Sequence, residues 1–412
     1  VSPSATAPIV NWDALTPVLI ILGAGVLGVL VEAFIARPAR LTLQAALSLV
    51  AILASGVSLF LRWGEVKAAG AAAAADPQFR LPEDFLPGAR MSAGLTEDPF
   101  SIAAQGVLLV IGFLAVLVMA DRTAVGDGAF AAQAADRPGS AEETESLLAG
   151  WTTTEVFPLT LFSLGGMMLF GASSDLITLF VILEMISLPL YILAATARHR
   201  RLLSQEAALK YFVLGAFASA FLLMGAALLY GFSGSVSYTD IAAAIRYGAV
   251  PGMDRLMLAG AALVVVGLLF KIAAVPFHAW SPDVYQGAPT PVTGFMAAGV
   301  KATAFLALVR FAYIAVAGLS WDLAPVLWAV SLATMAVGTV VGVVQRDVKR
   351  MLAYSAIAHA GYMLIGIISL NQQGVAALLL YCLAYGVATV GAFGVVTLVR
   401  TGHDGAAGPE AT

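Results

Sequence analysis

The sequence has few charged residues, a single cysteine and no strong excess of either charge. Only 11% of its 412 residues are charged, whereas 60% are hydrophobic. A soluble domain carries about 25% charged residues, so these side chains could not cover a globular surface, and we expect lipid to be the main solvent. The net charge of −4 is too small to indicate nucleic acid or any strongly charged partner.

The one cysteine, Cys382, lies inside an apolar run. A single cysteine forms no intrachain disulfide and holds no iron–sulfur cluster. If electrons pass through a larger assembly that contains this chain, we expect that they do not pass through metal centres held by this chain. Residues Val1–Asp13 lack a basic region and a small-residue cleavage site, so they do not resemble a secretory signal.

Long apolar runs are abundant. A bilayer-spanning helix needs about 20 mostly apolar residues, and eleven segments are candidates. In chain order they are Leu15–Ala36, Leu41–Leu61, Pro99–Ala120, Thr154–Ala172, Leu176–Ala197, Ala207–Gly231, Leu256–Val275, Pro291–Val316, Leu323–Val344, Lys349–Leu370 and Gly374–Val399. Two polar connections, Arg62–Asp98 and Asp121–Thr153, are expected to be surface loops. The pattern predicts an all-α, polytopic transmembrane helical bundle.

Basic residues gather in the connections that follow odd-numbered spans. These residues are Arg37, Arg40, Arg122, Arg137, Arg198, Arg200, Arg201, Arg346, Lys349, Arg350 and Arg400. The short connections after even-numbered spans hold only Arg246 and Arg255. Because cytoplasmic loops carry an excess of Lys and Arg, we expect the N-terminus outside and the C-terminus inside.

A glycine pattern in the first span imitates a nucleotide site. Gly23-Ala24-Gly25-Val26-Leu27-Gly28 matches the G-x-G-x-x-G fingerprint. The apolar run continues unbroken through Ile35, however, and no acid follows about 20 residues on, where a ribose contact belongs. We therefore interpret the glycines as small residues for close helix packing in lipid and find no nucleotide site.

Five ionisable residues interrupt the apolar runs. They are Glu184, Lys210, Lys271, Lys301 and His359. Glu184 lies nine residues after Asp175, which at 1.5 Å per residue is roughly 13 Å into its span. Lys301 lies ten residues into the eighth span, and His359 lies ten residues past Lys349. Charged groups at such depth are costly and usually functional.

Structural interpretations compete with the functional one. Lys210, about one turn inside the sixth span, could extend its head group to the interface. His359 could be a hydrogen-bonded packing residue, and Glu184 and Lys271 could form a fixed ion pair. Lys301 is too deep to reach water easily. For the set together we favour function, because such residues are rare in spans. Glu32, nearer a helix end, is expected to pack or to face an interface.

Four prolines in sixteen residues follow Lys271, namely Pro276, Pro282, Pro289 and Pro291. They prevent one continuous helix. Broken helices at membrane depth line a cavity or are buried in protein, and they accompany ion sites in transporters. A loop at the membrane surface is the alternative, and His278 and Asp283 fit either interpretation.

These residue types suit proton transfer. Burial disfavours a charged lysine and a nearby carboxylate favours it, so a lysine between these influences takes or releases a proton when its partner moves. We expect Glu184 to act on one lysine by approach and retreat. Nothing supports nucleophilic catalysis, and His278 and His359 lack the spacing of metal ligands.

Four stretches resemble subunit N of the proton-pumping NADH-quinone oxidoreductase, respiratory complex I, a member of the antiporter-like subunit family. They are FKIAAVPFHAWSPDVYQGAPTPVTGFMAAGVKATAF (Phe270–Phe305), ILEMISLPLYILAA (Ile182–Ala195), EAALKYFVLGAFASA (Glu206–Ala220) and RDVKRMLAYSAIAHAGYMLIG (Arg346–Gly366). The likeness covers roughly residues 98–400. Related Mrp-type sodium/proton antiporter subunits share VPFH and APTPV, as do the other two antiporter-like subunits of the complex. They usually differ at residues 283–287, which favours subunit N.

The resemblance implies an antiporter-like inverted-repeat fold of fourteen helices, of which about eleven are present. It implies Glu184 as the acid of the fifth helix, Lys210 and Lys301 as the lysines of the sixth and eighth, and Lys271 in the broken seventh helix. His359 is a weaker member of the same set. The chain itself is expected to bind no redox cofactor. FMN and iron–sulfur clusters are expected in other subunits, with quinone as the substrate of the complex.

The resemblance also implies a division of the chain and a setting for it. Residues 1–153 would hold three N-terminal helices, residues 154–316 the first five-helix repeat, and residues 317–412 three helices of an incomplete second repeat. The expected partners are the other membrane-arm subunits, including neighbouring antiporter-like subunits, and the lipid bilayer. The expected location is the bacterial cytoplasmic membrane, with the N-terminus periplasmic.

The sequence departs from the family pattern at its end. After the eleventh span only Thr401–Thr412 follows, which is polar and Gly-rich. The second broken helix and the two helices after it are missing. A truncated sequence is the favoured explanation, with a separate chain or a degenerate protein as alternatives. The first residue is Val rather than Met, which fits an unusual start codon or an incomplete N-terminus.

Three functions remain open at this point. The first is a proton-relaying subunit of NADH-quinone oxidoreductase, a translocase driven by quinone reduction elsewhere in the complex. The second is an Mrp-type sodium/proton antiporter subunit. The third is a purely structural subunit whose buried charges only lock helices together.

Overall fold

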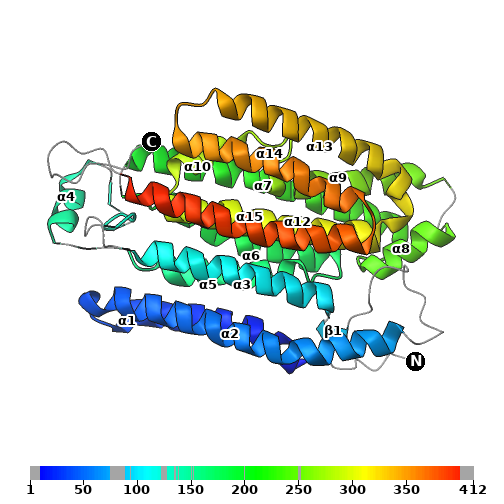
Figure 1. Cartoon of the computed structure of the whole chain (residues 1–412), viewed down its shortest axis with the longest axis horizontal. Coiled ribbons are helices and arrows are strands. Elements are labelled where there is room, and N and C mark those ends of the chain that lie inside the picture. The colour runs from blue at the N-terminus through cyan, green and yellow to red at the C-terminus, as the bar shows by residue number, and fades with distance from the viewer. Residues whose placement is uncertain are drawn as a thin grey trace.

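Long helices lie side by side and reverse direction from one to the next (Figure 1). The computed structural model describes residues 10–74, 89–92, 94–121, 128–133, 136–137, 139–149, 151, 153–198, 200–248 and 252–399. The short helices α4 (Ala141–Leu148) and α8 (Tyr238–Tyr247) lie at opposite ends of the bundle. We call these ends the α4 end and the α8 end.

Long helices make up most of the described chain. They are α1 (Trp12–Phe34), α2 (Arg37–Ala74), α3 (Pro99–Ala120), α5 (Val156–Phe170), α6 (Leu176–Ala194), α7 (Arg201–Ser233), α9 (Asp254–Ile272), α13 (Ser320–Val343), α14 (Val348–Ile368) and α15 (Gln372–Leu398). Shorter pieces are α10 (Trp280–Gly287), α11 (Thr290–Phe295), α12 (Lys301–Arg310), the π-helices η1 (Met296–Val300) and η2 (Phe311–Ala315), and the 3₁₀-helix η3 (Ala317–Leu319). Strands β1 (Ala89–Ser92) and β2 (Leu95–Glu97) pair antiparallel.

The expected multi-span architecture is confirmed. Within the described residues, 10 helices are long and apolar enough to cross a membrane. The remaining expected span, Thr154–Ala172, corresponds to α5, which has only 15 residues and is shorter than the roughly 20 that a full crossing needs.

The two expected surface loops are wrong in part. α2 continues through Arg62 to Ala74, so the start of the Arg62–Asp98 segment is helical. Alanine is the strongest helix former, and the Ala-rich sequence that resembled a loop extends the helix instead. The Asp121–Thr153 segment contains α4, with Glu142 and Glu143 in its first turn. Acidic side chains at this position stabilise a helix by interacting with its dipole.

Polar side chains fix where several spans begin. Asp98 accepts from the backbone N–H of Ser101, whose side chain bonds back to Asp98 in a capping box. Asp175 and Asp347 accept from the backbone three residues on, as does Asn371. These side chains satisfy N–H groups that a helix start leaves without partners, so several acids that border the spans cap helices.

The segment from α11 to η2 forms the centre of the bundle. An 18-residue stretch of the span Thr290–Ala315 is completely buried, whereas only 22% of the corresponding stretch of Ala317–Val343, which contains α13, is buried. The central span is therefore surrounded by protein, and α13 presents most of its surface outward. The expected break after Lys271 is confirmed, because α9 ends at Ile272 and α10 begins only at Trp280.

Small residues allow close helix contacts, as expected for packing in lipid. A Cβ at Gly225 of α7 would lie 2.7 Å from the Gly260 carbonyl oxygen of α9. The glycine pattern in α1 acts similarly. A Cβ at Gly25 would lie 2.8 Å from Phe162 Cε1 and one at Gly28 2.9 Å from Gln44 Oε1. The packing interpretation of that pattern is therefore confirmed at these two glycines.

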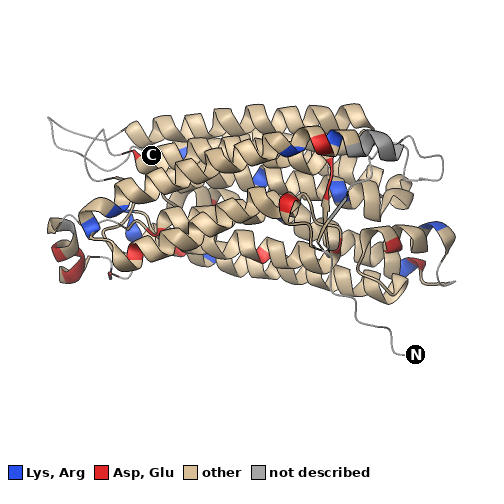
Figure 2. Cartoon of the chain, turned by 90° about the horizontal axis from the view of Figure 1, so that it is seen from below, with Lys and Arg blue, Asp and Glu red and all other residues tan. Residues whose placement is uncertain are grey.

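Charged residues gather toward the two ends of the bundle, and isolated ones interrupt the tan helices between them (Figure 2). The connections after α1, α6 and α13 lie at the α4 end. Arg198 and Arg200 belong to the connection after α6, and Arg350 lies in the first turn of α14. Arg122 and Arg400 of the expected basic set lie outside the described residues.

Candidate functional site

Lys271 lies in the last turn of α9 and is only 3% exposed. The next residue but one, Ala273, has a left-handed backbone (φ 62°) that ends the helix. The Lys271 Nζ donates a hydrogen bond of 2.8 Å to Ser187 Oγ on α6. Ser187 Oγ in turn donates to the Leu183 carbonyl oxygen at 2.6 Å. A neutral hydroxyl is therefore the hydrogen-bond partner of this buried amine.

Aromatic rings enclose the same amine. Lys271 Nζ lies 5.7 Å from the centroid of the Tyr191 ring and 5.5 Å from that of Tyr211. The Tyr211 ring stacks on Trp280 at 5.0 Å, and Trp280 Nε1 donates to the Phe270 carbonyl oxygen at 2.9 Å. Ring faces attract an ammonium group without giving it a formal counter-charge, so they stabilise the cation and leave it able to lose a proton.

Glu184 lies on α6 three residues before Ser187, so the two side chains share a helix face. Its side chain is half-buried. Among the described residues, no ion pair within 4.0 Å joins Glu184 to Lys271. The alternative of a fixed ion pair is thus not observed, and the Lys271 amine bonds to Ser187 instead.

Lys301 begins α12 directly after the π-helix η1 and is only 2% exposed. Its Nζ donates to the carbonyl oxygen of Ala356 on α14 and lies 6.0 Å from the Tyr385 ring centroid. No ion pair to Lys301 occurs within the part of the chain that the structure describes. The expectation that Lys301 is too deep to reach water easily agrees with this burial.

His359 lies beside a cavity of about 380 Å³ between α14 and α15. Its Nδ1 lies 2.6 Å from Tyr381 Oη, and its ring centroid lies 5.1 Å from that of Tyr385. Ala356, the hydrogen-bond acceptor of Lys301, lines the same cavity, as does Tyr385. The structure therefore brings Lys301 and His359 to one site, and the His359 bond to Tyr381 fits both the packing and the functional interpretation.

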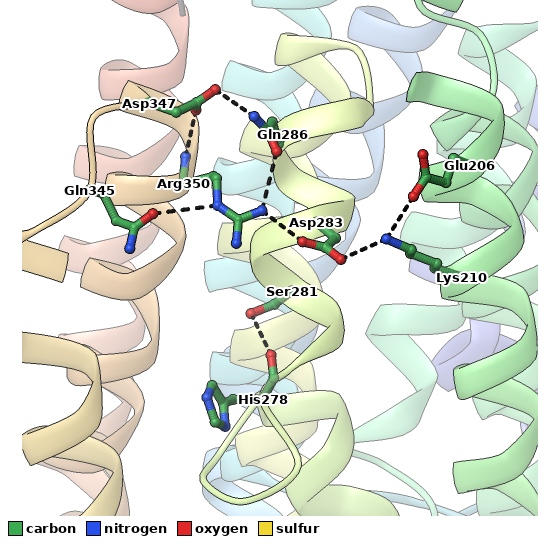
Figure 3. A network of polar contacts seen from close by, with 9 residues as sticks. All are labelled: Glu206, Lys210, His278, Ser281, Asp283, Gln286, Gln345, Asp347 and Arg350. Atoms are coloured by element: carbon green, nitrogen blue, oxygen red, sulfur yellow. Dashed lines mark hydrogen bonds and ion pairs between the residues drawn. The ribbon is translucent and has the colours of Figure 1, made fainter. Parts of the chain in front are cut away.

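Lys210 lies apart from these residues, in a polar cluster at the α4 end (Figure 3). Its Nζ is 2.8 Å from Glu206 Oε1 and 2.8 Å from Asp283 Oδ2. The side chain is 42% exposed. Its head group thus reaches the end of the bundle, as one interpretation expected, and forms two ion pairs there.

Asp283 holds this cluster together. Its Oδ1 accepts from Arg350 Nη1 of α14 at 2.7 Å, while its Oδ2 accepts from Lys210 of α7. Gln286 accepts from Arg350 at 3.2 Å and donates to Asp347 at 2.8 Å. Burial opposes ionisation of Asp283, but the bonds from Lys210 and Arg350 outweigh it and hold the pKa of the carboxyl below its ordinary value.

A buried ion pair was missed in the sequence. Arg310, the last residue of α12, is 1% exposed and donates from Nη2 to Asp98 Oδ2 at 2.7 Å. Its Nε donates to the Gly171 carbonyl oxygen at 2.6 Å. The available signal was an arginine inside the same apolar span as Lys301. Its partner lies 212 residues away in sequence, so spacing alone could not pair them.

Glu32 packs at the α4 end, as expected for a residue near a helix end. Its Oε2 lies 3.3 Å from Arg40 Nη1, and its Oε1 accepts from Gln44 at 2.8 Å and from Thr154 Oγ1. Among the residues that the structure describes, no group of three His, Cys, Asp or Glu side chains is placed to hold a metal ion.

Comparison with known proteins gives a consistent result. The family model described as "NADH:quinone oxidoreductase/Mrp antiporter, TM" matches residues 173–406. A protein named NADH-quinone oxidoreductase subunit N from Beutenbergia cavernae is 50% identical over 397 residues, which cover 95% of this chain and 72% of the relative. Subunit N 3 from Streptomyces griseus is 48% identical over 425 residues, covering 99% of this chain and 73% of the relative.

Solved structures of similar shape include a chain of respiratory complex I from Thermus thermophilus with bound aureothin. It has a TM-score of 0.66 and 32% identity and covers 93% of this chain and 70% of that one. A chain of the Mrp complex from a Dietzia species has a TM-score of 0.73 at 21% identity, covering 94% of this chain and 65% of that one. At that identity the second likeness shows a shared fold alone.

Proposed function

We propose that this chain relays protons through buried Glu and Lys residues. The chain belongs to the NADH:quinone oxidoreductase/Mrp antiporter family, and its relatives include proteins named NADH-quinone oxidoreductase subunit N. It is a multi-pass membrane protein that works with the other membrane-arm subunits of an NADH-quinone oxidoreductase. Quinone reduction elsewhere in that complex drives the relay. In this proposal FMN and the iron–sulfur clusters belong to other subunits.

One observation carries the residue assignment. Lys271 and Lys301 are both buried, and their amines bond to neutral oxygens, those of Ser187 and Ala356. A buried ammonium without a formal counter-charge is costly, so neither protonation state is held permanently by the surroundings. Lysines in this situation suit proton exchange, whereas a fixed ion pair would trap the charge.

The proposed relay uses the two lysines in order. Glu184 approaches Lys271 across the Ser187 position and raises its affinity for a proton, and its retreat releases that proton. α9 and α12 pack together, so Lys301 is the next acceptor inside the bundle. His359 and Tyr381 then lie beside the same cavity and supply the following polar groups. Lys210 takes part at the entrance, where water reaches it.

Orientation and repeat structure follow from the same proposal. Because basic residues concentrate at the α4 end, we place that end in the cytoplasm and the N-terminus on the periplasmic side of the bacterial membrane. Residues 154–316, from α5 to η2, then form the first five-helix repeat. Residues 317–412 hold part of a second repeat, and residues 1–153 precede both.

Substitution of Lys271 and Glu184 tests the proposal in the assembled enzyme reconstituted in liposomes. We expect Lys271→Ala and Glu184→Ala to reduce NADH-driven proton pumping at least tenfold (about 1.4 kcal/mol or more of lost coupling), and NADH-quinone reduction to fall with it if coupling is tight. Lys67→Ala is the control, because Lys67 is an exposed lysine on α2. Normal pumping in both variants would sink the proposal. Sodium-dependent proton exchange without NADH oxidation would favour the antiporter alternative.

A further inference from the structure

α10 connects the polar cluster of Figure 3 to the rings around Lys271. Asp283 lies three residues after Trp280, so both side chains are on one face of this eight-residue helix. Trp280 stacks on Tyr211 at 5.0 Å and on Phe270 at 5.5 Å. Tyr211 is one of the two rings that enclose the Lys271 amine. A shift of α10 therefore changes the surroundings of Lys271 directly.

Side-chain contacts position α10, because the chain break separates it from α9. Residues 273–279 form turns between the two helices. Asp283 bonds to Lys210 on α7 through one oxygen and to Arg350 on α14 through the other, at 2.8 and 2.7 Å. One carboxylate thus joins two cations on two helices. Without its charge, Lys210 and Arg350 would repel each other across α10.

The ionisable groups around Asp283 and Lys271 come from three helices and from the chain break between α9 and α10. They are Glu184 and Tyr191 on α6, Glu206, Lys210 and Tyr211 on α7, Asp347 and Arg350 on α14, and His278 before α10. Of these, Lys210 and Arg350 bond to Asp283 directly. Asp283 is the acid that both cations share, which makes it the residue whose neutralisation changes the position of α10 most.

We propose that Asp283 is a positioning residue for Lys271, acting through Trp280 and Tyr211. The inference rests on the proposed function, in which Lys271 carries protons. While Asp283 is charged, α7 and α14 hold α10 in place, and Trp280 keeps the Tyr211 ring against the Lys271 amine. When the Asp283 charge is lost, α10 moves, the ring packing opens and the proton affinity of Lys271 changes.

The test measures the pH dependence of NADH-driven proton pumping by the assembled enzyme in liposomes. Asp283→Asn keeps the shape of the side chain and removes its charge. We expect it to displace the midpoint of the pH profile by on the order of one pH unit, the usual spread that protein surroundings impose on side chains. Asp283→Glu restores the charge and should return the midpoint toward that of the wild type. Asp254→Asn, an exposed acid in the first turn of α9, should leave the midpoint unchanged.

A second variant tests the route through Trp280 and keeps the inference testable if Asp283→Asn misfolds. Trp280→Phe leaves the charge cluster intact and removes the bond to the Phe270 carbonyl and the indole stack, so we expect a displaced midpoint here too. A wild-type midpoint in Asp283→Asn overturns the inference. If Asp283→Asn does not assemble, a wild-type midpoint in Trp280→Phe overturns it. Lys271→Ala and Glu184→Ala separate the two proposals, because normal pumping in both of these variants defeats the proposed function itself. If Lys271→Ala is inactive while Asp283→Asn keeps the wild-type midpoint, only the positioning role fails.

Discussion

α12 carries one buried cation at each end, and the surroundings of the two differ. Lys301 begins the helix and Arg310 ends it, and both are almost fully buried. The Arg310 guanidinium faces the Asp98 carboxylate and the Gly171 carbonyl, whereas the Lys301 amine donates to the Ala356 carbonyl. A buried cation with a carboxylate partner stays charged and joins helices. One that bonds only to a neutral oxygen can exchange its proton, so the partner, and not burial alone, separates the two roles.

The backbone beside each cation is also unusual. The π-helix η1 directly precedes Lys301, and the π-helix η2 directly follows Arg310. π-helical turns are rare and frequently occur at functional sites. Here they adjoin the two residues whose side chains reach α14 and Asp98, the residue before α3. The irregular turns therefore mark both positions, and the polar partners tell them apart.

The largest expected effect is on stability, at the paired end. Arg310→Met leaves the Asp98 carboxylate buried without its cation, and losing one partner of a buried pair costs about 3–5 kcal/mol. We expect little assembled enzyme in membranes and a clearly lower thermal unfolding temperature. The double variant Asp98→Asn with Arg310→Met removes both charges and should recover most of the loss. Equal stability of the single and double variants would contradict the pairing.

The next effect is on transport, at the Lys301 end. Lys301→Met removes the exchangeable amine and leaves no carboxylate behind, so we expect stability within about 1 kcal/mol of the wild type. NADH-driven pumping should fall at least as far as in Lys271→Ala. Quantitation of the assembled enzyme is the control that separates lost transport from lost protein. A destabilised but fully pumping Lys301→Met variant would reverse the comparison.

A smaller effect is expected beside the cavity next to Lys301. Tyr381→Phe removes the hydroxyl that lies 2.6 Å from His359 Nδ1. One hydrogen bond contributes about 0.5–1.5 kcal/mol, so pumping should fall no more than about tenfold. Tyr362→Phe is a matched control on α14, because its exposed ring lies farther from His359. Equal effects of the two changes would argue against a specific role for Tyr381.

The smallest effect is expected at the exposed lysine. Lys210→Ala breaks ion pairs whose partners are also partly exposed, and such pairs are worth about 0–1 kcal/mol. Arg350 still bonds to Asp283 in this variant, so the free energy of unfolding should change little and pumping should fall less than in Lys271→Ala. A loss of pumping as complete as in Lys271→Ala would contradict this ranking.

The pKa of Asp283 lies below its ordinary value of 3.8. The contribution of the Asp283 carboxylate to stability is therefore present above pH 3.8 and is lost as the pH falls through the lowered pKa.

Backbone features at the site could be predicted because local sequence determines them. Prolines after Lys271 exclude a continuous helix whatever surrounds them, and the break lies where they predict it. Apolar length similarly predicts the spans, and with them the depth of Glu184 and Lys301. The family likeness added the expected roles.

Contacts between distant helices could not be predicted from the sequence. Ser187 lies 84 residues from Lys271, and Asp98 lies 212 residues from Arg310. Only the assembled bundle brings α6 to Lys271, and the start of α3 to Arg310. Ser187 follows Glu184 by one helical turn, so the shared face was visible in the sequence, but which of the two meets Lys271 was not. The Ala-rich extension of α2 was missed because its sequence shows little contrast between apolar and polar positions, and such a sequence resembles a linker.

The most direct measurement is the number of protons translocated per NADH oxidised, in liposomes with matched amounts of assembled enzyme. Wild type, Lys301→Met and the double variant Asp98→Asn with Arg310→Met form the comparison. We predict a lower ratio in Lys301→Met and a wild-type ratio in the double variant, because only the lysine bonded to a neutral oxygen exchanges protons. An unchanged ratio in Lys301→Met, or an equal fall in both variants, would contradict the distinction between the two ends of α12.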